Sequence, residues 1–557
     1  MSFSSPFAPL AIPDDVDLWS LLFDKRQRPL NFPVTKEIMT CGEGSGRSYS
    51  YADLRSSSVA FGTGLQALWG WKKGDVLAMF TPNSVDTATV TLGALWAGGI
   101  VSPANPLYTV DELAFQLKNS NSSAIVTQTA FIKTAVAAAR KVGIPDSRII
   151  LIGEGRDKTG RFQHFTGMLT FDTTGQHKKP TISPDVDLAF LVYSSGTTGL
   201  PKGVCLTHTN IVANVLQMDF LEGHYFQPFG GVDGKGDKSL GILPFFHIYG
   251  LTCGVLMTIY LGWQLVILER FELDKVLRTI QDYGITVLYI PPPVVLLFSK
   301  SPLVDKYDLT CLKVMHSGAA PLTRELTEAV WDRLKIPVKQ GYGLSETSPC
   351  CTSQSMDEWA KFITSIGKLA PNLEARIVDE EGKDVAEGDD GEFWVKGPNV
   401  FKRYLNNPER TEAAFSPDGF FKTGDIMRRD KHGNLYCVDR LKELIKYKGF
   451  PVPPAELEGL LVGHADVDDA CVIGIEDKSQ ATEVPRAHVV LRPGVAASAA
   501  KEKEIADWVA KQVAPHKRLR GGIEFVAQIP KSASGKILRR VVRDEARKKE
   551  RGEGARL

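Results

Sequence analysis

The sequence has few cysteines and no excess of charge, and we expect no secretory leader. Eight cysteines in 557 residues are too few for a disulfide scaffold, and none forms a C-x-x-C pair, so we expect reduced thiols in a reducing compartment. Lys and Arg number 66 against 65 Asp and Glu, a balance that argues against a dedicated nucleic-acid-binding protein. Residues 1–13 lack the basic and then apolar order of a signal peptide.

The segment Gly241–Leu268 contains no Asp, Glu, Lys or Arg and is long enough to cross a bilayer. Pro244, His247 and Gln264 interrupt it, and neither flank carries an excess of Lys and Arg. We therefore expect this segment to form the buried wall of a pocket, and we expect no transmembrane segment.

The order of apolar segments predicts an α/β fold. A length of 557 residues corresponds to about two to four domains. In the first half of the chain short buried strands alternate with helical patterns, which is typical of largely parallel sheets. The expected strands are Val76–Phe80, Ala124–Thr127, Ile149–Ile152, Thr286–Ile290 and Leu312–Met315, and the expected helices are Ala52–Leu68, Asp111–Lys118 and Leu322–Arg333.

The pattern changes to hairpins in the second half, where Gly391–Lys396 and Leu435–Val438 are expected strands. Further on, a strand at Ala470–Ile475 and a helix at Lys501–Val513 predict a small α+β domain. A charged segment at 439–442 predicts a hinge before it. The expected division is an N-terminal core at 1–438, a hinge at 439–442 and a C-terminal domain at 443–557.

The segment Ser194–Gly203 reads SSGTTGLPKG and combines glycines, hydroxyls and one lysine. Glycines let a backbone wrap closely around a phosphate, while hydroxyls and a lysine supply donors and positive charge. It is not a Walker A loop, because Pro201 precedes Lys202 and Gly203 follows it. Expected strands at Leu188–Tyr193 and Gly203–Leu206 would place this phosphate loop at the tip of a hairpin.

This loop resembles the signature of the acyl-adenylate-forming superfamily, which includes acyl- and aryl-CoA synthetases, adenylation domains and firefly-type luciferases. Further boxes follow in the order of that superfamily: Pro244–Leu251, Ser317–Pro321, Gly341–Glu346, Thr423–Asp425, Asp439–Lys446 and Pro530–Lys536. Phe246–Tyr249 and Asp439–Phe450 are most similar to the 4-coumarate–CoA ligases. The resemblance implies a large N-terminal domain of stacked α/β sheets with a small β-barrel-like part, and a small mobile C-terminal domain.

The resemblance also implies a reaction in two halves. A carboxylic acid and ATP, with Mg²⁺, give acyl-AMP and pyrophosphate, and coenzyme A then displaces AMP. The implied phosphate contacts are Ser194, Ser195, Gly196, Thr197, Thr198 and Lys202. Thr198 and Glu346 would hold Mg²⁺ through oxygen and act in catalysis. The implied adenine and ribose contacts are Ala319, Gln340, Gly341, Tyr342, Ser345, Asp425, Arg440 and Lys442, with Tyr342 stacking on the adenine ring.

Two lysines are assigned to different halves of the reaction by the resemblance. Lys536 would swing over the α-phosphate and stabilise the charge that develops during adenylation. Rotation of the small domain about Lys442 would remove Lys536 and bring Lys446 to the adenylate. The implied coenzyme A contacts are Arg270, Lys448 and Gly449.

The resemblance places the acyl pocket at His247, Tyr249, Cys253, Ser317, Gly343 and Pro349. Small residues deeper in would leave room for a flat aromatic acid, and a medium-chain fatty acid fits nearly as well. A luciferase-like oxidase and a catalytically silent binding or scaffold protein are the other functions considered. The catalytically silent protein is disfavoured because the chain retains the residues that the reaction needs, namely Lys202, Glu346, Asp425, Lys446 and Lys536.

Two local features complete the sequence-based hypothesis. Pro451 stands where relatives usually carry glutamine, and it has no backbone N–H to donate. We expect this to change the balance between the two half-reactions. The chain ends in Ala555-Arg556-Leu557, a variant of the Ser-Lys-Leu address, which predicts peroxisomal localisation through the import receptor, and cytoplasmic localisation otherwise.

Overall fold

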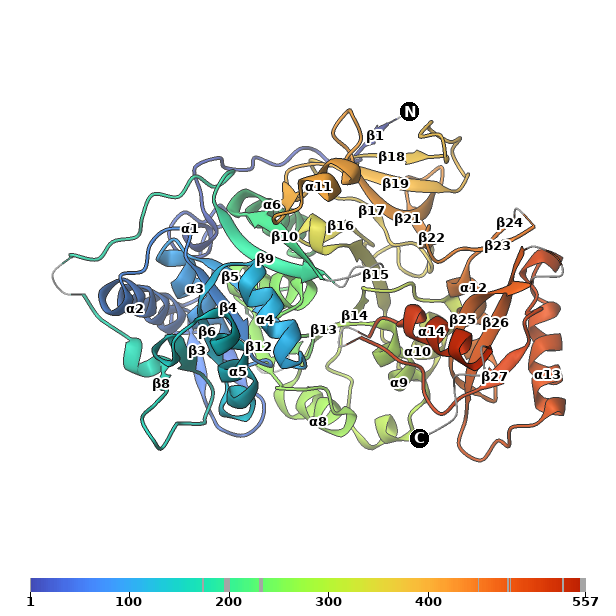
Figure 1. The fold of residues 1–557 in the computed structure, drawn as a ribbon, viewed down its shortest axis with the longest axis horizontal. Helices are drawn as coiled ribbons and strands as arrows, with labels where there is room; N and C mark the ends of the chain where they lie inside the picture. Colours follow the sequence, from blue (N-terminus) through green and yellow to red (C-terminus); the bar gives the residue numbers. More distant parts are fainter. Residues whose placement is uncertain are drawn as a thin grey trace.

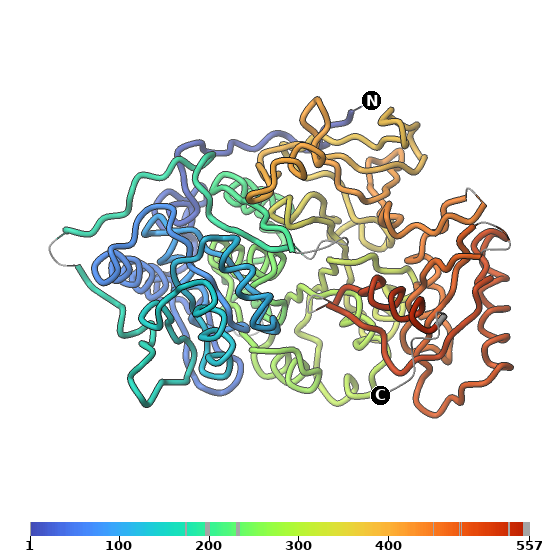
Figure 2. The backbone as a smooth tube through the Cα atoms, viewed as in Figure 1, coloured from blue at the N-terminus to red at the C-terminus, as the bar shows by residue number. Residues whose placement is uncertain are grey.

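The computed structural model describes residues 2–172, 175–194, 201–229, 234–448, 450–477, 480, 482–532 and 535–550, with the side chain of residue 550 left out. Two large mixed sheets form the left and centre of the molecule, and an antiparallel sheet lies above them (Figure 1). The C-terminal part, orange to red, forms a separate body at the right of the same view (Figure 2).

The first large sheet contains a parallel core. Its described strands follow the order β20-β10-β9-β5-β4-β6-β7-β8, and only β10 pairs antiparallel to its neighbours. The central strand β4 is buried along its whole length, as expected for a strand covered on both faces. The strands are β4 (Val76–Phe80), β5 (Ile100–Ala104), β6 (Ser122–Thr127), β7 (Ile149–Leu151), β8 (Gln163–His164), β9 (Leu188–Ser194), β10 (Lys202–Thr207) and β20 (Arg403–Tyr404).

The second large sheet, in the order β17-β16-β15-β14-β13-β11-β12-β2-β3, is parallel from β15 to β2. The carboxyl ends of its parallel strands meet at one edge, which is where ligands usually bind such sheets. The strands are β2 (Glu37–Cys41), β3 (Ser48–Ser50), β11 (Lys238–Gly241), β12 (Gln264–Ile267), β13 (Val287–Ile290), β14 (Val314–Ser317), β15 (Val338–Gly343), β16 (Cys350–Ser353) and β17 (Lys368–Leu369).

Helices cover these sheets and separate them. Helix α6 contacts β9 and β10 of the first sheet and β16 of the second, so it lies between the two sheets and is buried along most of its length. The helices of this part are α1 (Leu18–Phe23), α2 (Tyr51–Trp69), α3 (Thr87–Trp96), α4 (Val110–Asn119), α5 (Ile132–Val142), α6 (His208–Glu222), α7 (Met257–Leu261), α8 (Leu273–Tyr283), α9 (Pro292–Lys300) and α10 (Arg324–Leu334).

Helices α2 and α3 approach each other closely at two glycines. A Cβ added to Gly62 would lie 2.6 Å from the carbonyl oxygen of Gly93, and one added to Gly93 would lie 2.6 Å from that of Ser58. Only glycine permits this distance between the two backbones.

The antiparallel sheet has the order β1-β18-β19-β21-β22. It consists of β1 (Phe3–Ser4), β18 (Glu374–Val378), β19 (Gly391–Lys396), β21 (Phe421–Arg429) and β22 (Leu435–Arg440), with α11 (Pro408–Ala414) between β20 and β21. The last strand continues through Asp439 and Arg440, so these two residues belong to the sheet of the large domain. The boundary at 438 stays a prediction.

The C-terminal part contains a two-stranded and a three-stranded sheet covered by helices. Its elements are β23 (Ile445–Tyr447), β24 (Phe450–Val452), α12 (Pro454–Gly463), β25 (Val467–Asp477), β26 (Thr482–Leu491), α13 (Ala499–Ala510), β27 (Ile523–Phe525) and α14 (Arg539–Glu550). The helix expected at Lys501–Val513 is therefore α13, which begins after the N-cap Ser498 and ends three residues early.

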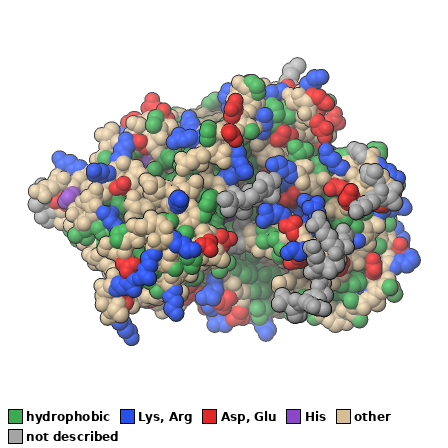
Figure 3. Space-filling model, viewed as in Figure 1, with side chains coloured by type: hydrophobic (Ala, Val, Ile, Leu, Met, Phe, Trp, Pro, Cys, Tyr) green, Lys and Arg blue, Asp and Glu red, His purple; other side chains and the backbone are tan. Residues whose placement is uncertain are grey.

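The α/β class is confirmed, including large stacked sheets and a small C-terminal domain. Among the described residues no helix is long and apolar enough to span a membrane. The apolar segment Gly241–Leu268 instead contains a π-helical segment at Gly250–Leu256, helix α7 and strand β12, all buried. On the face shown in Figure 3, Lys and Arg side chains are interspersed with Asp and Glu.

Candidate active site

The ends of the phosphate loop are held together by strand pairing. Strands β9 and β10 are antiparallel, and Lys202 lies opposite Ser194 in the register, so the two strands predicted to flank the loop pair with each other. The predicted phosphate contacts Ser195, Gly196, Thr197 and Thr198 lie outside the described residues.

Lys202 lies next to an aromatic ring that sequence analysis did not single out. Its Nζ sits 4.9 Å from the ring centroid of Tyr404, whose hydroxyl donates to Oε1 of Glu346 at 2.9 Å. Burial, together with the positive charge of Arg410, lowers the pKa of Lys202. Tyr404 belongs to the short edge strand β20, and no motif surrounds it that would have marked it. Ser345 begins the turn that carries Glu346.

Asp425, Tyr342 and Arg440 meet at the junction of three strands. The Tyr342 hydroxyl donates to Oδ2 of Asp425 at 2.6 Å, and Nε of Arg440 lies 3.2 Å from Oδ1. Asp425 is 3% exposed and faces Arg440 directly across β21 and β22. Burial and the Asp425 carboxylate raise the pKa of Tyr342 well above its usual range. This cluster unites residues predicted from three separate boxes.

Small residues shape the backbone beside Tyr342. A Cβ at Gly343 would lie 1.9 Å from the carbonyl oxygen of Pro349, and one at Gly341 would lie 2.6 Å from Nε2 of His316. Ala319 adopts φ +73°, a conformation that costs a residue with a Cβ about 1–3 kcal/mol and that clusters at functional sites.

Gln340 does not present its amide to this space. Its Nε2 donates to the carbonyl of Ile363 at 2.8 Å, and its Oε1 accepts from the backbone N–H of Leu322 at 3.3 Å. The side chain thus fixes the loops on both sides of the predicted adenine slot.

Lys536 from the C-terminal part reaches the same region. Its pKa is lowered to about 8, first by burial and then by the charge of Arg440, against the opposing effect of Glu443 and Asp425. A Cβ at the preceding Gly535, which has φ +81°, would lie 3.0 Å from Pro291 of the large domain. The segment that carries Lys536 therefore packs against the end of strand β13.

The acyl pocket predicted from the sequence has Tyr249 in its wall. The Tyr249 hydroxyl donates to the carbonyl of His316 at 3.0 Å, and Nδ1 of His247 accepts from the backbone N–H of Tyr249 at 3.3 Å. Burial and the charge of Lys536 lower the pKa of His247 to about 4, so its imidazole is neutral at physiological pH.

Two small polar groups lie on the same wall. The thiol of Cys253 is buried, which raises its pKa well above the usual range. The hydroxyl of Ser317 is buried and finds no hydrogen-bond partner in the described part of the chain.

Four predicted residues lie apart from this cluster. Lys442, Lys446 and Lys448 are exposed, and Lys448 adopts φ +48°. Arg270 is 72% exposed and pairs weakly with its neighbour Glu269 at 3.8 Å. Gly449 lies outside the described residues. The predicted coenzyme A contacts are thus not assembled around Lys536.

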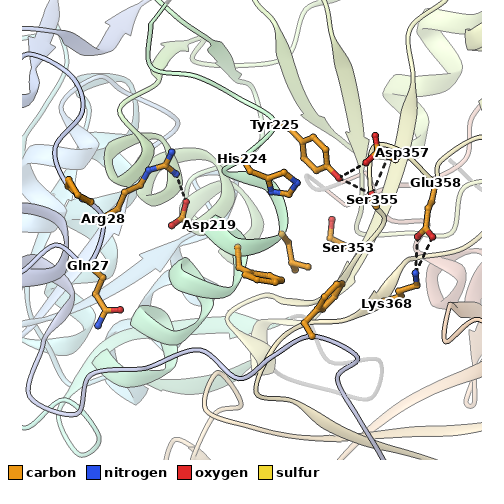
Figure 4. Close-up of a pocket in the computed structure, with 14 residues that line it drawn as sticks. Gln27, Arg28, Asp219, His224, Tyr225, Ser353, Ser355, Asp357, Glu358 and Lys368 are labelled. Atoms are coloured by element: carbon orange, nitrogen blue, oxygen red, sulfur yellow. Dashed lines mark hydrogen bonds and ion pairs between the residues drawn. The ribbon is translucent and has the colours of Figure 1, made fainter.

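A cavity of about 920 Å³ opens away from the predicted site. None of the predicted site residues that the structure describes lines it. Figure 4 shows an ion pair between Arg28 and Asp219 on one side and one between Glu358 and Lys368 on the other. Ser353 also lines this cavity. The chemistry expected from the sequence therefore belongs to the cluster around Asp425, not to this cavity.

The family profile described as AMP-binding enzyme matches residues 26–405, and that of the AMP-binding enzyme C-terminal domain matches residues 456–536. The chain is 40% identical over 490 residues to Probable 4-coumarate–CoA ligase 1 of Dictyostelium discoideum, covering 85% of this chain and 86% of the relative.

Similarity extends to a plant enzyme and to a solved structure. Identity to Peroxisomal OPC-8:0-CoA ligase 1 of Arabidopsis thaliana is 37% over 476 residues, covering 85% and 84%. The crystal structure of ATP-bound MatB from Rhodopseudomonas palustris superposes with a TM-score of 0.81 at 28% identity, covering 95% of this chain and 98% of that chain. These comparisons confirm the predicted resemblance.

Proposed function

Because the chain belongs to the family of AMP-binding enzymes, we propose that it is an ATP-dependent ligase that joins a carboxylic acid to coenzyme A. In the first half-reaction a carboxylate oxygen attacks the α-phosphorus of ATP, and pyrophosphate leaves. In the second, the thiolate sulfur of coenzyme A attacks the acyl carbon of acyl-AMP, and AMP leaves with the electron pair of the broken bond.

The observation that carries the proposal is the convergence of Tyr342, Asp425, Arg440 and Lys536 from separate parts of the chain. Asp425 offers carboxylate oxygens to ribose hydroxyls, and Arg440 pairs with it at 3.2 Å. Lys536 supplies a positive charge for the phosphate oxygens at which negative charge develops. Lys202 stands at the end of the phosphate loop, where it would bind the departing phosphates.

Glu346 is a suitable carboxylate for Mg²⁺. One of its oxygens accepts from Tyr404, and Mg²⁺ usually takes one or two carboxylates together with substrate phosphates. Thr198 would add a hydroxyl oxygen. Bound Mg²⁺ would neutralise charge on the phosphates, while the hydrogen bond from Tyr404 orients Glu346.

Rotation at 439–442 would exchange the lysines between half-reactions. Lys536 is half-buried near Asp425, whereas Lys446 and Lys448 are exposed on the two-stranded sheet β23–β24. Turning the mobile small domain would withdraw Lys536 and bring Lys446, Lys448 and Gly449 toward acyl-AMP and coenzyme A, with Arg270 near the coenzyme A phosphates.

Replacing Pro451 with glutamine is expected to change the rate of thioester formation relative to adenylation by about threefold or more, the effect of one hydrogen bond. Pro451 is exposed and lies opposite Lys446 in the β23–β24 pair, so glutamine adds an N–H and an amide beside that lysine. The two half-reactions are measured separately by pyrophosphate release and by thioester formation from acyl-AMP. Pro451→Ala, which restores only the N–H, is the matched control, and two unchanged rates would refute the expectation.

The acid is proposed to be a flat aromatic acid, with a medium-chain fatty acid as the alternative. Tyr249 and Cys253 pack in the large hydrophobic core, which suits an apolar portion of either acid. Mass spectrometry of products formed with ATP, Mg²⁺, coenzyme A and a panel of aryl and alkyl acids tests the function. A coenzyme A-dependent thioester together with AMP is the expected result. Folded protein that forms no AMP with any acid would favour the silent scaffold.

We also propose peroxisomal import through the C-terminal Ala555-Arg556-Leu557, which lies outside the described residues. One relative is itself named a peroxisomal ligase. Removing these three residues is expected to move a fluorescently tagged chain from peroxisomes to the cytoplasm, as fluorescence microscopy would show. Peroxisomal fluorescence that persists after the deletion would overturn the proposal, and Leu557→Met, a conservative replacement at the last position, serves as the control.

A further inference from the structure

Glu222, at the end of helix α6, contacts side chains from four adjacent strands of the second sheet. It is 1% exposed and lies between the two large sheets. Its contacts are the Tyr289 hydroxyl to Oε2 at 2.8 Å, the Ser353 hydroxyl to Oε1 at 2.9 Å, Lys339 Nζ to Oε1 at 3.0 Å and His316 Nδ1 to Oε1 at 3.0 Å. One carboxylate thus contacts β13, β14, β15 and β16.

The strand register explains how these side chains meet. Tyr289 pairs with His316 across β13 and β14, and His316 pairs with Lys339 across β14 and β15, so the three residues form one row on the same face of the sheet. Ser353 reaches the carboxylate from the neighbouring strand β16. We call these five residues the Glu222 cluster.

The Glu222 cluster is a costly arrangement to bury. Lys339 is 0% exposed, and taking both charges out of water offsets most of their attraction, so such a pair seldom stabilises a fold on its own. Contacts with His316 and Lys339 nevertheless outweigh burial and keep the pKa of Glu222 well below its usual range. Because the ion pair between Glu222 and Lys339 contributes little to stability, we look for its role in the side chains that it holds in position.

Two members of the cluster hold Tyr249 of the predicted acyl pocket. The His316 carbonyl accepts from the Tyr249 hydroxyl, and the Tyr289 ring packs edge-on against the Tyr249 ring with centroids 6.1 Å apart. The Glu222 carboxylate beside Nδ1 favours the imidazole tautomer that carries its proton there. Ser317, with its unpartnered hydroxyl, follows His316 directly.

We propose that Glu222 is a positioning residue that sets the shape of the acyl pocket, and with it the choice of acid, by holding His316 and Tyr289 against Tyr249. This inference rests on the proposed ligase function. It assigns Glu222 no contact with the reacting atoms. Its influence reaches the acid through Tyr249, whereas Asp425 and Lys536 on the nucleotide side make no contact with it.

The test is the double variant Glu222→Gln/Lys339→Met, which removes both buried charges and leaves neither unpaired. We expect the dissociation constant of the preferred acid, measured by calorimetry, to rise about tenfold, because the lost hydrogen bonds are each worth a several-fold change. The order of kcat/KM across the acid panel should change as well. KM for ATP is expected to change less than the dissociation constant of the acid, within about threefold, since Asp425 and Lys536 make no contact with the Glu222 cluster.

The matched control is Arg28→Gln/Asp219→Asn, which removes another ion pair of helix α6 at 2.6 Å without touching the strand row. It should leave the dissociation constant and the order of acids unchanged. Tyr289→Phe keeps the ring and removes one donor, so it should raise the dissociation constant about threefold even where the double variant is unstable.

Unchanged acid affinity in both cluster variants would overturn the inference, as would a parallel rise in KM for ATP. The proposed function is judged separately by whether the wild-type protein forms AMP. Because acid binding is measured directly by calorimetry, the two failures are distinguishable.

Discussion

Lys536→Ala is expected to slow acyl-AMP formation by about 10²–10³-fold, the usual effect of losing one preorganised donor to developing charge. The side chain lies with Asp425 and Arg440 in the present domain arrangement. Thioester formation from supplied acyl-AMP should stay within about threefold of wild type, because the lysine is withdrawn for that step. Pyrophosphate release and thioester formation measure the two halves. An equal fall in both would contradict the division of labour between the two domain orientations.

The pH dependence of adenylation offers a control for this assignment. The pKa of Lys536 is about 8, so its positive charge is present below that pH and is lost as pH rises through it. Adenylation by the wild type should therefore decline above about pH 8. Lys536→Arg keeps its charge in this range and should lack that decline. A wild-type profile that stays flat up to pH 10 would argue against a role for the lysine charge.

Arg539→Met is expected to lower the free energy of unfolding of the C-terminal part by about 3–5 kcal/mol, the usual cost of breaking a buried ion pair. Arg539 is 9% exposed. Its Nε donates to Oε1 of Glu458 at 2.9 Å, and its other nitrogens pair with Glu458 and Glu443. The variant leaves both carboxylates buried without their partner. Hydrogen exchange over residues 439–550 would measure the loss of protection.

The control for Arg539→Met also removes the charge of Glu458, which that variant leaves without its partner. Adding Glu458→Gln to Arg539→Met should recover a large part of the lost stability, because the amide costs less to bury than an unpaired carboxylate. If Arg539→Met lowers the free energy of unfolding by less than about 1 kcal/mol, solvent weakens the ion pairs of Arg539 as it weakens pairs at a protein surface. Asp439, which contributes to this environment, has its pKa raised by burial to about 6.

Local patterns in the sequence predicted many elements closely. Val76–Phe80 and Gly391–Lys396 are strands with the predicted bounds, because a short apolar run or an alternating one is a property of neighbouring residues. Helix α2 was predicted within one residue at each end, and its N-cap Ser50 and left-handed C-cap Gly70 explain its bounds. The pairing of Asp439 and Arg440 with β21 had no such signal, since it depends on a partner strand.

The sequence by itself determined the class of fold, the phosphate loop and the family, because ordered motifs and periodicity lie in contiguous residues. Only the tertiary structure decided that Tyr342 bonds to Asp425, 83 residues away, and that Lys339 meets Glu222 across 117 residues. The Glu222 cluster left no mark in the sequence. Such contacts depend on which strands are neighbours and in which register, and burying their charges is tolerated only once all partners are in place.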